Sequence, residues 1–108
     1  MANTFKIDTK SSVSTSGNNV VTAGASSTLV ILSILIANKT AASAQADVFI
    51  NKKSGDDVFL VKNAPIPGGS SLEIISGSKI ILASNDVLQI TSNTASALDA
   101  SVSYLEQT

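Results

Sequence analysis

VFLVKNAPIPGGSSLEIISGSKIILASNDVLQI, residues 58–90, is the stretch that decides the fold of this chain. Short apolar segments alternate in it with turn-forming segments at intervals of about ten residues, which is the spacing of an all-β sandwich or barrel. Pro65 and Pro67 lack a backbone donor, and each forces the residue before it to be extended. We therefore expect the chain to turn a corner here and to pass from one sheet to the other.

The same rhythm continues toward the N-terminus. The longest apolar run, LVILSILIA (residues 29–37), is apolar on both faces, as expected for the central strand of a two-layer structure. NKKSGDD (residues 51–57) is predicted to be a hairpin turn in which Gly55 supplies a positive φ. Phe5 and Ile7 alternate with Lys6 and Asp8, and this alternation predicts a short half-buried strand.

Together the segments amount to eight or nine strands, and none of them has sustained helical periodicity. We therefore predict an all-β fold: a single-domain antiparallel β-sandwich of jelly-roll or Greek-key type over residues 1–108. Residues 1–19 are a candidate N-terminal strand and mobile arm. SSVSTSGNN (residues 11–19) contains one apolar residue and several turn formers, so it is interpreted as a loop or a mobile arm.

The composition excludes several classes of function. The chain has no cysteine and no histidine, which removes disulfides, thiolate nucleophiles, imidazole bases and nearly all zinc or iron sites. All seven basic residues are lysines, spread from Lys6 to Lys79, which argues against a nucleic-acid binder. The N-terminal MANTFKIDTK lacks the apolar region of a secretory signal, so we expect synthesis in a cytoplasm without export by that route. The longest apolar run is shorter than the roughly 18 residues of a membrane span, so no membrane partner is expected.

Asn51, Ser54, Asp56 and Asp57 together offer several oxygen ligands for calcium. Their spacing matches no loop with a known calcium mechanism, so we interpret them as a solvated hairpin tip and predict no metal site. Lys52 and Lys53 in the same turn are interpreted as solubilising charges that discourage edge pairing.

Glu73 and Asp86 are the candidate pair of carboxylates for glycoside hydrolysis, which needs two such groups beside a substrate cleft. With three Phe, one Tyr and no Trp the chain offers little for a sugar to stack on, so both are interpreted as solvent-facing charges. GSK (residues 77–79) and PGGSS (residues 67–71) lack the context of a phosphate-binding loop. Asn38 begins a glycosylation pattern that we interpret as a chance match. No catalytic, cofactor-binding or metal-binding residue is predicted, and no enzymatic activity.

The low charge is the more informative feature. Charged residues make up 14% of the chain, against about a quarter in typical soluble domains. We therefore expect part of the surface to be covered by another copy of the chain or by another protein.

The run DDVFLVKNAPIPGGSSLEIISGSKIILASNDVLQITSNTASALDASVSYLE (residues 56–106), together with TLVILSILIANKT (residues 28–40), resembles the small virion structural proteins of tailed phages. The likeness is strongest to phages of marine and freshwater cyanobacteria and related bacteria, and it covers about residues 29–106. The resemblance implies a β-sandwich that decorates the head or belongs to the neck or tail. It transfers no functional residue.

The expected function is that of a virion structural component, a capsid decoration or cement protein that is assembled in the host cytoplasm. Its expected partners are other virion proteins and further copies of the chain, without a cofactor. A neck, tail or fibre component is the alternative, and so is a module that binds carbohydrate on a host surface. The scarcity of aromatic residues disfavours the last alternative, and glycan-array binding would discriminate it.

Overall fold

The computed structural model describes residues 3–16, 18–53, 55–74 and 80–108. In them the chain forms nine β-strands, which confirms the predicted all-β fold and strand number. The strands are β1 (Asn3–Lys10), β2 (Asn18–Thr22), β3 (Thr28–Asn38), β4 (Ala44–Asn51), β5 (Asp57–Ile66), β6 (Ser71–Glu73), β7 (Ile80–Leu82), β8 (Val87–Ser92) and β9 (Leu98–Gln107). No helix long and apolar enough to cross a membrane occurs in these residues.

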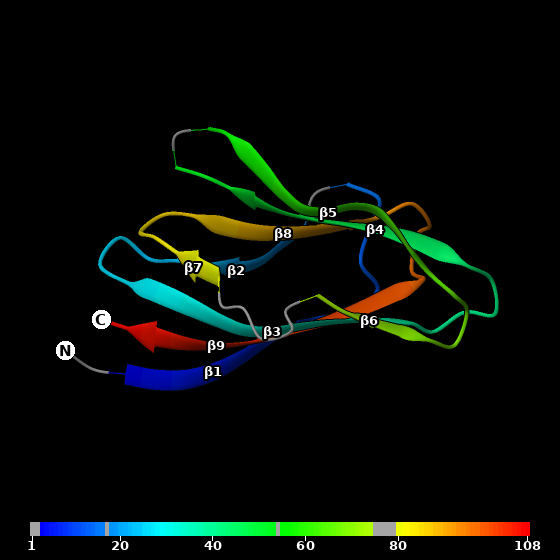
Figure 1. Ribbon diagram of the computed structural model, residues 1–108, viewed down its shortest axis with the longest axis horizontal. Coiled ribbons are helices and arrows are strands. Elements are labelled where there is room, and N and C mark those ends of the chain that lie inside the picture. Colours follow the sequence, from blue (N-terminus) through cyan, green and yellow to red (C-terminus); the bar gives the residue numbers. More distant parts are fainter. Residues whose placement is uncertain (1–2, 17, 54, 75–79) are drawn as a thin grey trace.

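The strands form two antiparallel sheets that pack as the two layers of a sandwich (Figure 1). One sheet has the order β1-β9-β3-β6, with β7 also paired to β3, and the other has the order β2-β8-β4-β5. The short strands β6 and β7 pair with different parts of the same edge of β3, so they occupy the place of a single strand. Counted in this way, the strand order is that of a jelly roll, as predicted.

β3 is the central strand of its sheet, as predicted, because it pairs with β9 on one side and with β6 and β7 on the other. A bulge between Ile31 and Ser33 shifts the alternation of its side chains by one position. The side chains of β3 that are fully buried in the core are Leu29, Ile31, Ile34 and Ile36. The opposite face of β3 is apolar too, but Leu35 on that face is 40% exposed. The described part of the chain therefore leaves this face of the strand partly exposed.

β4 and β5 form the predicted hairpin, in which Gly55 has a φ of 99°. β5 lies at the edge of its sheet, where Pro65 can be accommodated because its missing N–H faces away from the ladder. The turn after Ile66 carries the chain to β6 in the other sheet, which confirms the predicted corner. Gly68 is required in this turn, since a Cβ there would overlap the backbone of Ala41.

β1 is a strand as predicted, but the prediction that its apolar face is buried is wrong. Phe5 and Ile7 are 77% and 61% exposed, whereas Lys6 and Asp8 lie on the inner face, opposite buried residues of β9. The reason is that β9 offers polar partners to the inward-facing side chains of β1. Lys6 forms an ion pair of 2.7 Å with Glu106, and the Tyr104 hydroxyl donates a 2.9 Å hydrogen bond to Asp8.

Residues 11–16, which follow β1, form a loop between the two sheets. Val13 is fully buried in the core, and its N–H donates a 2.7 Å hydrogen bond to the carbonyl oxygen of Leu98. The Ser12 N–H donates to the Asp99 carboxylate. Residues of this loop thus pack on the body of the sandwich, and Asn18 and Asn19, at the end of the predicted loop, belong to β2.

Candidate functional site

The hairpin tip that offers oxygen ligands does not assemble a cation site in the described residues. The Asn51 side-chain amide donates a 2.8 Å hydrogen bond to the exposed Asp57 carboxylate, Asp56 is exposed, and Ser54 lies outside the described residues. Over the part of the chain that the structure describes, no group of three or more His, Cys, Asp or Glu side chains is placed to hold a metal ion.

Asp86 is buried, with 2% of its surface exposed, so the interpretation of this residue as a solvent-facing charge is wrong. Its carboxylate accepts hydrogen bonds from the Lys52 ammonium at 2.6 Å and from the backbone N–H groups of Lys53 and Ala83 at 3.1 Å each. Its carbonyl oxygen also accepts from the Ala23 N–H at 2.9 Å. One residue therefore joins the β4–β5 hairpin, the turn before β8 and the loop after β2.

The surroundings of Asp86 keep it ionised. Burial on its own would raise the pKa of the carboxyl group, but the hydrogen bonds from Lys52, Lys53 and Ala83 hold the pKa below its ordinary value. A general acid needs the opposite shift. Asp86 is thus built as a structural anion.

Glu73 is exposed at the edge of the other sheet, where it lies opposite Leu35 of β3. The Glu73 carboxylate is therefore open to solvent, whereas the Asp86 carboxylate is buried and hydrogen-bonded. The two do not form an acid–base pair in the structure.

Asn38 is buried, with 2% of its surface exposed, and its side chain is occupied. Its amide group donates 2.8 Å hydrogen bonds to the carbonyl oxygens of Ala42 and Ile66, and its side-chain oxygen accepts from the N–H and hydroxyl of Thr40. The glycosylation pattern is in fact a loop-closing motif. The segment of residues 67–71 leads into a strand and not into a helix, and residues 77–79 lie outside the described residues.

The most distinctive surface of the molecule is the outer face of the sheet that contains β1, β9 and β3. Phe5, Leu105, Val30 and Ile81 are consecutive cross-strand partners on this face, one each from β1, β9, β3 and β7. We call these four residues the outer apolar row. Phe5 is 77% and Ile81 53% exposed, while Val30 and Leu105 are half-buried. The row is thus a continuous apolar strip on the side of the sheet that faces solvent.

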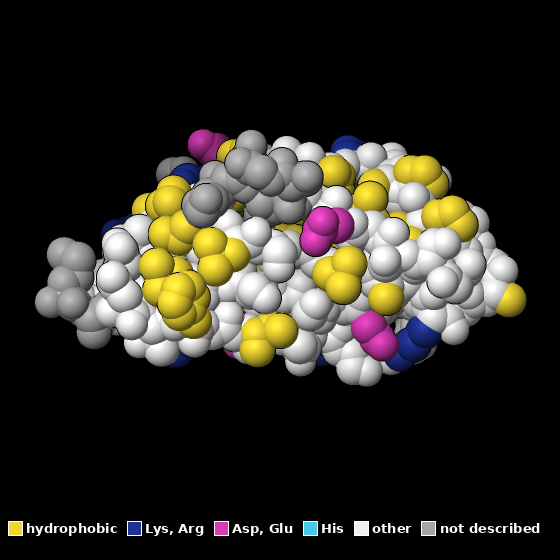
Figure 2. Space-filling view, turned by 60° about the horizontal axis from the view of Figure 1, so that its bottom comes forward, with side chains coloured by type: hydrophobic (Ala, Val, Ile, Leu, Met, Phe, Trp, Pro, Cys, Tyr) yellow, Lys and Arg dark blue, Asp and Glu magenta, His cyan; other side chains and the backbone are white. Residues whose placement is uncertain are grey.

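Most of the remaining outer face carries neutral side chains. Between the outer apolar row and the opposite end of the sheet, short side chains such as Ser33, Ser101, Ser103 and Thr9 occupy the cross-strand positions. Figure 2 shows a large group of hydrophobic side chains at the end where the chain termini lie, further hydrophobic side chains along the face, and few charged groups. A low-charge face with an apolar strip is typical of an interaction surface.

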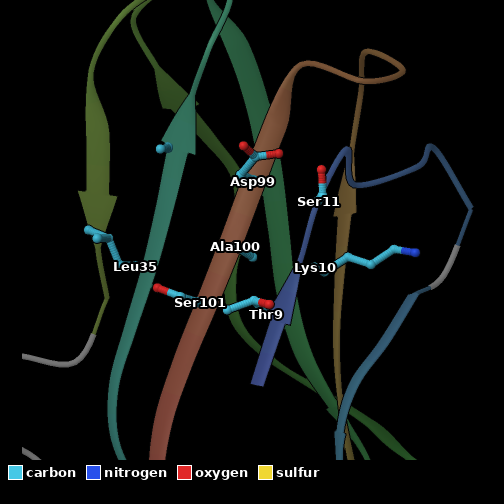
Figure 3. A pocket seen from close by; sticks show the side chains of 8 residues that line it. Thr9, Lys10, Ser11, Leu35, Asp99, Ala100 and Ser101 are labelled. Atoms are coloured by element: carbon cyan, nitrogen blue, oxygen red, sulfur yellow. The ribbon is translucent and has the colours of Figure 1, made fainter. Parts of the chain in front are cut away.

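At the opposite end this face is hollowed (Figure 3). The hollow has a volume of about 260 Å³ and is lined by Thr9, Lys10, Ser11, Leu35, Ala37, Asp99, Ala100 and Ser101. Asp99 accepts hydrogen bonds from the Ser12 N–H at 2.8 Å and from the Lys39 ammonium at 2.9 Å, and these interactions lower the pKa of its carboxyl group. The ionised Asp99 carboxylate, paired with Lys39, gives the hollow a polar rim.

A second hollow, of about 200 Å³, lies on the outer face of the other sheet and has a polar lining. Asp47 in it accepts a 2.6 Å hydrogen bond from the backbone N–H of Asn63, whose φ of 53° is unusual for a strand residue. The Lys62 ammonium lies 3.9 Å from the same carboxylate and 4.5 Å from the centre of the Phe59 ring. Phe59 in turn packs on Phe49, with ring centres 4.9 Å apart.

Comparison with models of known protein families found no match, and a search of curated protein sequences found none either. The function is therefore argued from the geometry of the surface. The outer apolar row was not foreseen, although two signals for it were visible: the apolar residues on both faces of residues 29–37, and the alternation of Phe5 and Ile7 with charges.

Proposed function

We propose that this protein is a structural component of a tailed-phage virion, a capsid decoration or cement protein that acts by protein–protein assembly. The outer apolar row is the observation that carries the proposal. It places two side chains more than half exposed, Phe5 and Ile81, in one continuous strip with Leu105 and Val30. Isolated apolar residues on a surface are ordinary, whereas a strip across four strands marks a contact surface.

The fold is compatible with this function but also with others. Jelly rolls serve as viral capsid domains and also as lectin domains, so the architecture alone does not choose between assembly and sugar binding. The low charge of the outer face and the resemblance of residues 29–106 to virion proteins favour assembly.

The test is immunogold labelling of intact virions with an antibody raised against the purified chain. We expect gold over the whole capsid, and no gold when the antibody has first been absorbed with the purified protein. Gold confined to the neck or tail would instead identify a component of those parts. Absence of labelling from every particle would refute the proposal.

The contact surface is tested by two matched substitutions in phage that encodes the variant chain. Ile81→Asp places a charge in the outer apolar row, and Val58→Asp places one on the other sheet, at a side chain of similar exposure, 53% against 48%. We expect Ile81→Asp to lower the amount of the protein per particle and Val58→Asp to leave it unchanged. Equal incorporation of both variants would exclude the row as the contact.

The polar hollow on the other sheet gives a second candidate function, a carbohydrate-binding module. Gln45, Asp47 and Thr91 line it with groups that can bond to sugar hydroxyls. No aromatic residue is among the described residues that line it, and the Phe59 ring is already contacted by Phe49 and Lys62, which limits stacking on a sugar. A specific glycan-array signal that is lost in Gln45→Ala would favour this function.

A further inference from the structure

β1 differs from the other strands that lie at sheet edges in the described part of the chain. It has 8 residues, it pairs with β9 on one side, and it leaves its other side open at the margin of the sheet (Figure 1). Its register with β9 runs from Asn3 to Lys10 without a bulge. An edge of this kind presents a regular row of backbone donors and acceptors to any further strand.

The other described edges are protected. β5 contains Pro65, two register shifts and the positive φ of Asn63, and β2 has 5 residues with a register shift. β6 and β7 have 3 residues each. These are the devices by which proteins prevent strand addition at an edge. β1 has no proline, no register shift and no positive φ, and it is the longest of the regular edges. Its protection is limited to charges such as the inward-pointing Lys6 and Asp8. Its backbone is therefore the most accessible of the described edges to a further strand.

We propose that β1 pairs in antiparallel fashion with β1 of a second copy of this chain, around a two-fold axis that places Ile7 opposite Ile7. The inference rests on the proposed function, because it names one partner in the assembly that this function requires.

Charge complementarity selects the register. Directly opposed residues in a sheet point to the same face, so a two-fold axis must pass between a residue and its own copy. An axis at Ile7 places Lys6 opposite Asp8 of the second copy, twice. An axis at Lys6 would oppose two lysines, and an axis at Asp8 would oppose two carboxylates, and like charges in such positions are destabilising. An axis at Thr9 would also oppose Asp8 and Lys10, but it would pair only residues 8–10 of β1, whereas the axis at Ile7 pairs residues 4–10.

The same register accounts for the two most exposed large apolar side chains of the chain's described part. Ile7, 61% exposed in one copy, packs on the second copy's Ile7. Phe5, 77% exposed, comes opposite Thr9 and within diagonal reach of Ile7 of the second copy. A two-fold axis perpendicular to the sheet also keeps both outer apolar rows on one side. The dimer thus presents a single wide face to the rest of the particle.

Cysteine cross-linking of the purified full chain tests the register directly, because the chain contains no cysteine of its own. Opposed residues of an antiparallel pair have Cα atoms about 4.5–5.5 Å apart, within the range that a disulfide bridges. We expect Ile7→Cys to give a covalent dimer under mild oxidation. Phe5→Cys alone and Thr9→Cys alone should not cross-link, since each residue lies about 13 Å along the strand from its own copy. An equimolar mixture of these two variants should cross-link.

Sedimentation velocity provides the second readout. We expect the wild-type chain to form dimers, and Ile7→Asp to weaken the dimer by at least about tenfold because it opposes two carboxylates. Ile81→Asp, in the outer apolar row but away from β1, should still dimerise. Circular dichroism controls for the fold of each variant.

Three results would overturn the inference: a monomeric wild type, cross-linking of Phe5→Cys as efficient as that of Ile7→Cys, or loss of the dimer in Ile81→Asp, which would indicate face-to-face packing. A monomeric chain that still labels virions would remove this inference and leave the proposed function in place. A dimeric chain whose antibody labels no virion would refute the proposed function and leave the β1 pairing in place.

Discussion

Replacing Asp86 with alanine removes one side chain that joins three connections at one end of the sandwich. The carboxylate accepts hydrogen bonds from the Lys52 ammonium at 2.6 Å and from the N–H groups of Lys53 and Ala83 at 3.1 Å. Asp86 itself is 2% exposed, so its charge contributes through these three bonds and not through solvation. Alanine leaves all three donors without this acceptor.

The expected cost follows from the exposure of the donors. Lys53 and Ala83 are exposed residues whose N–H groups water can partly reach, so each lost bond costs about 1 kcal/mol, the low end of the usual range. The Lys52 side chain is 38% exposed and can regain water, which limits the lost ion pair to about 1 kcal/mol. The sum is about 2–3 kcal/mol of the free energy of unfolding. For a domain of this length it corresponds to a fall of roughly 10–20 °C in the melting temperature.

Urea unfolding of the wild type and of Asp86→Ala measures this difference as a change in midpoint at constant slope. Asp57→Ala is the matched control, because Asp57 lies in the same hairpin but is exposed and accepts a hydrogen bond from the Asn51 side chain. We expect the control to stay within about 0.5 kcal/mol of the wild type. If Asp86→Ala behaved like Asp57→Ala, the three-way connection would contribute nothing and the reasoning would be refuted.

Three further predictions concern pH and the core. Folding lowers the pKa of Asp86 below its ordinary 3.8, so its contribution to stability is complete above that pH and is lost as the pH falls through the lower folded pKa. Urea unfolding of the wild type and of Asp86→Asn in this acid range should show that their difference in free energy of unfolding narrows as the pH falls. A difference that stays constant would contradict the lowered pKa of Asp86. Burial, and then the hydrogen bond to Asp8, raises the pKa of Tyr104, the single tyrosine, to about 12. The tyrosinate absorbance of the folded chain should therefore appear about two pH units later than that of a free tyrosine, and a midpoint near 10 would refute the buried placement. Ile34→Asp buries a charge at a fully buried position and should abolish soluble folding, whereas Leu35→Asp at the exposed neighbour should be tolerated, as solubility and circular dichroism would show.

Much of the fold was predictable because it depends on local patterns. The apolar run of residues 29–37 became the central strand, Gly55 took the positive φ of its hairpin, and the proline pair marked the passage between sheets. Each of these features is set by residues within a few positions of each other.

The two errors concern contacts between residues far apart in the chain. Alternation in β1 predicts a strand but not which of its faces points inward. That choice depends on β9, nearly a hundred residues away, where Glu106 pairs with Lys6 and Tyr104 bonds to Asp8. Asp86 looks like a turn residue of the surface until Lys52, from another hairpin, is placed beside it. For the same reason the outer apolar row was not predicted, because it exists only through the register of four separated strands.

The pairing of β1 with β9 also has a consequence for biosynthesis. Asn3 lies opposite Gln107 and Lys10 opposite Ala100, so the first strand must wait for the last one to be translated. Until then one edge of β3 lacks its longest hydrogen-bonded neighbour, since β9 pairs with β3 as well. All-β domains with such distant pairings fold slowly, on the scale of milliseconds to seconds, and remain prone to aggregation meanwhile. A nascent chain of this kind therefore completes its sheet in a single late step, after the ribosome has delivered β9.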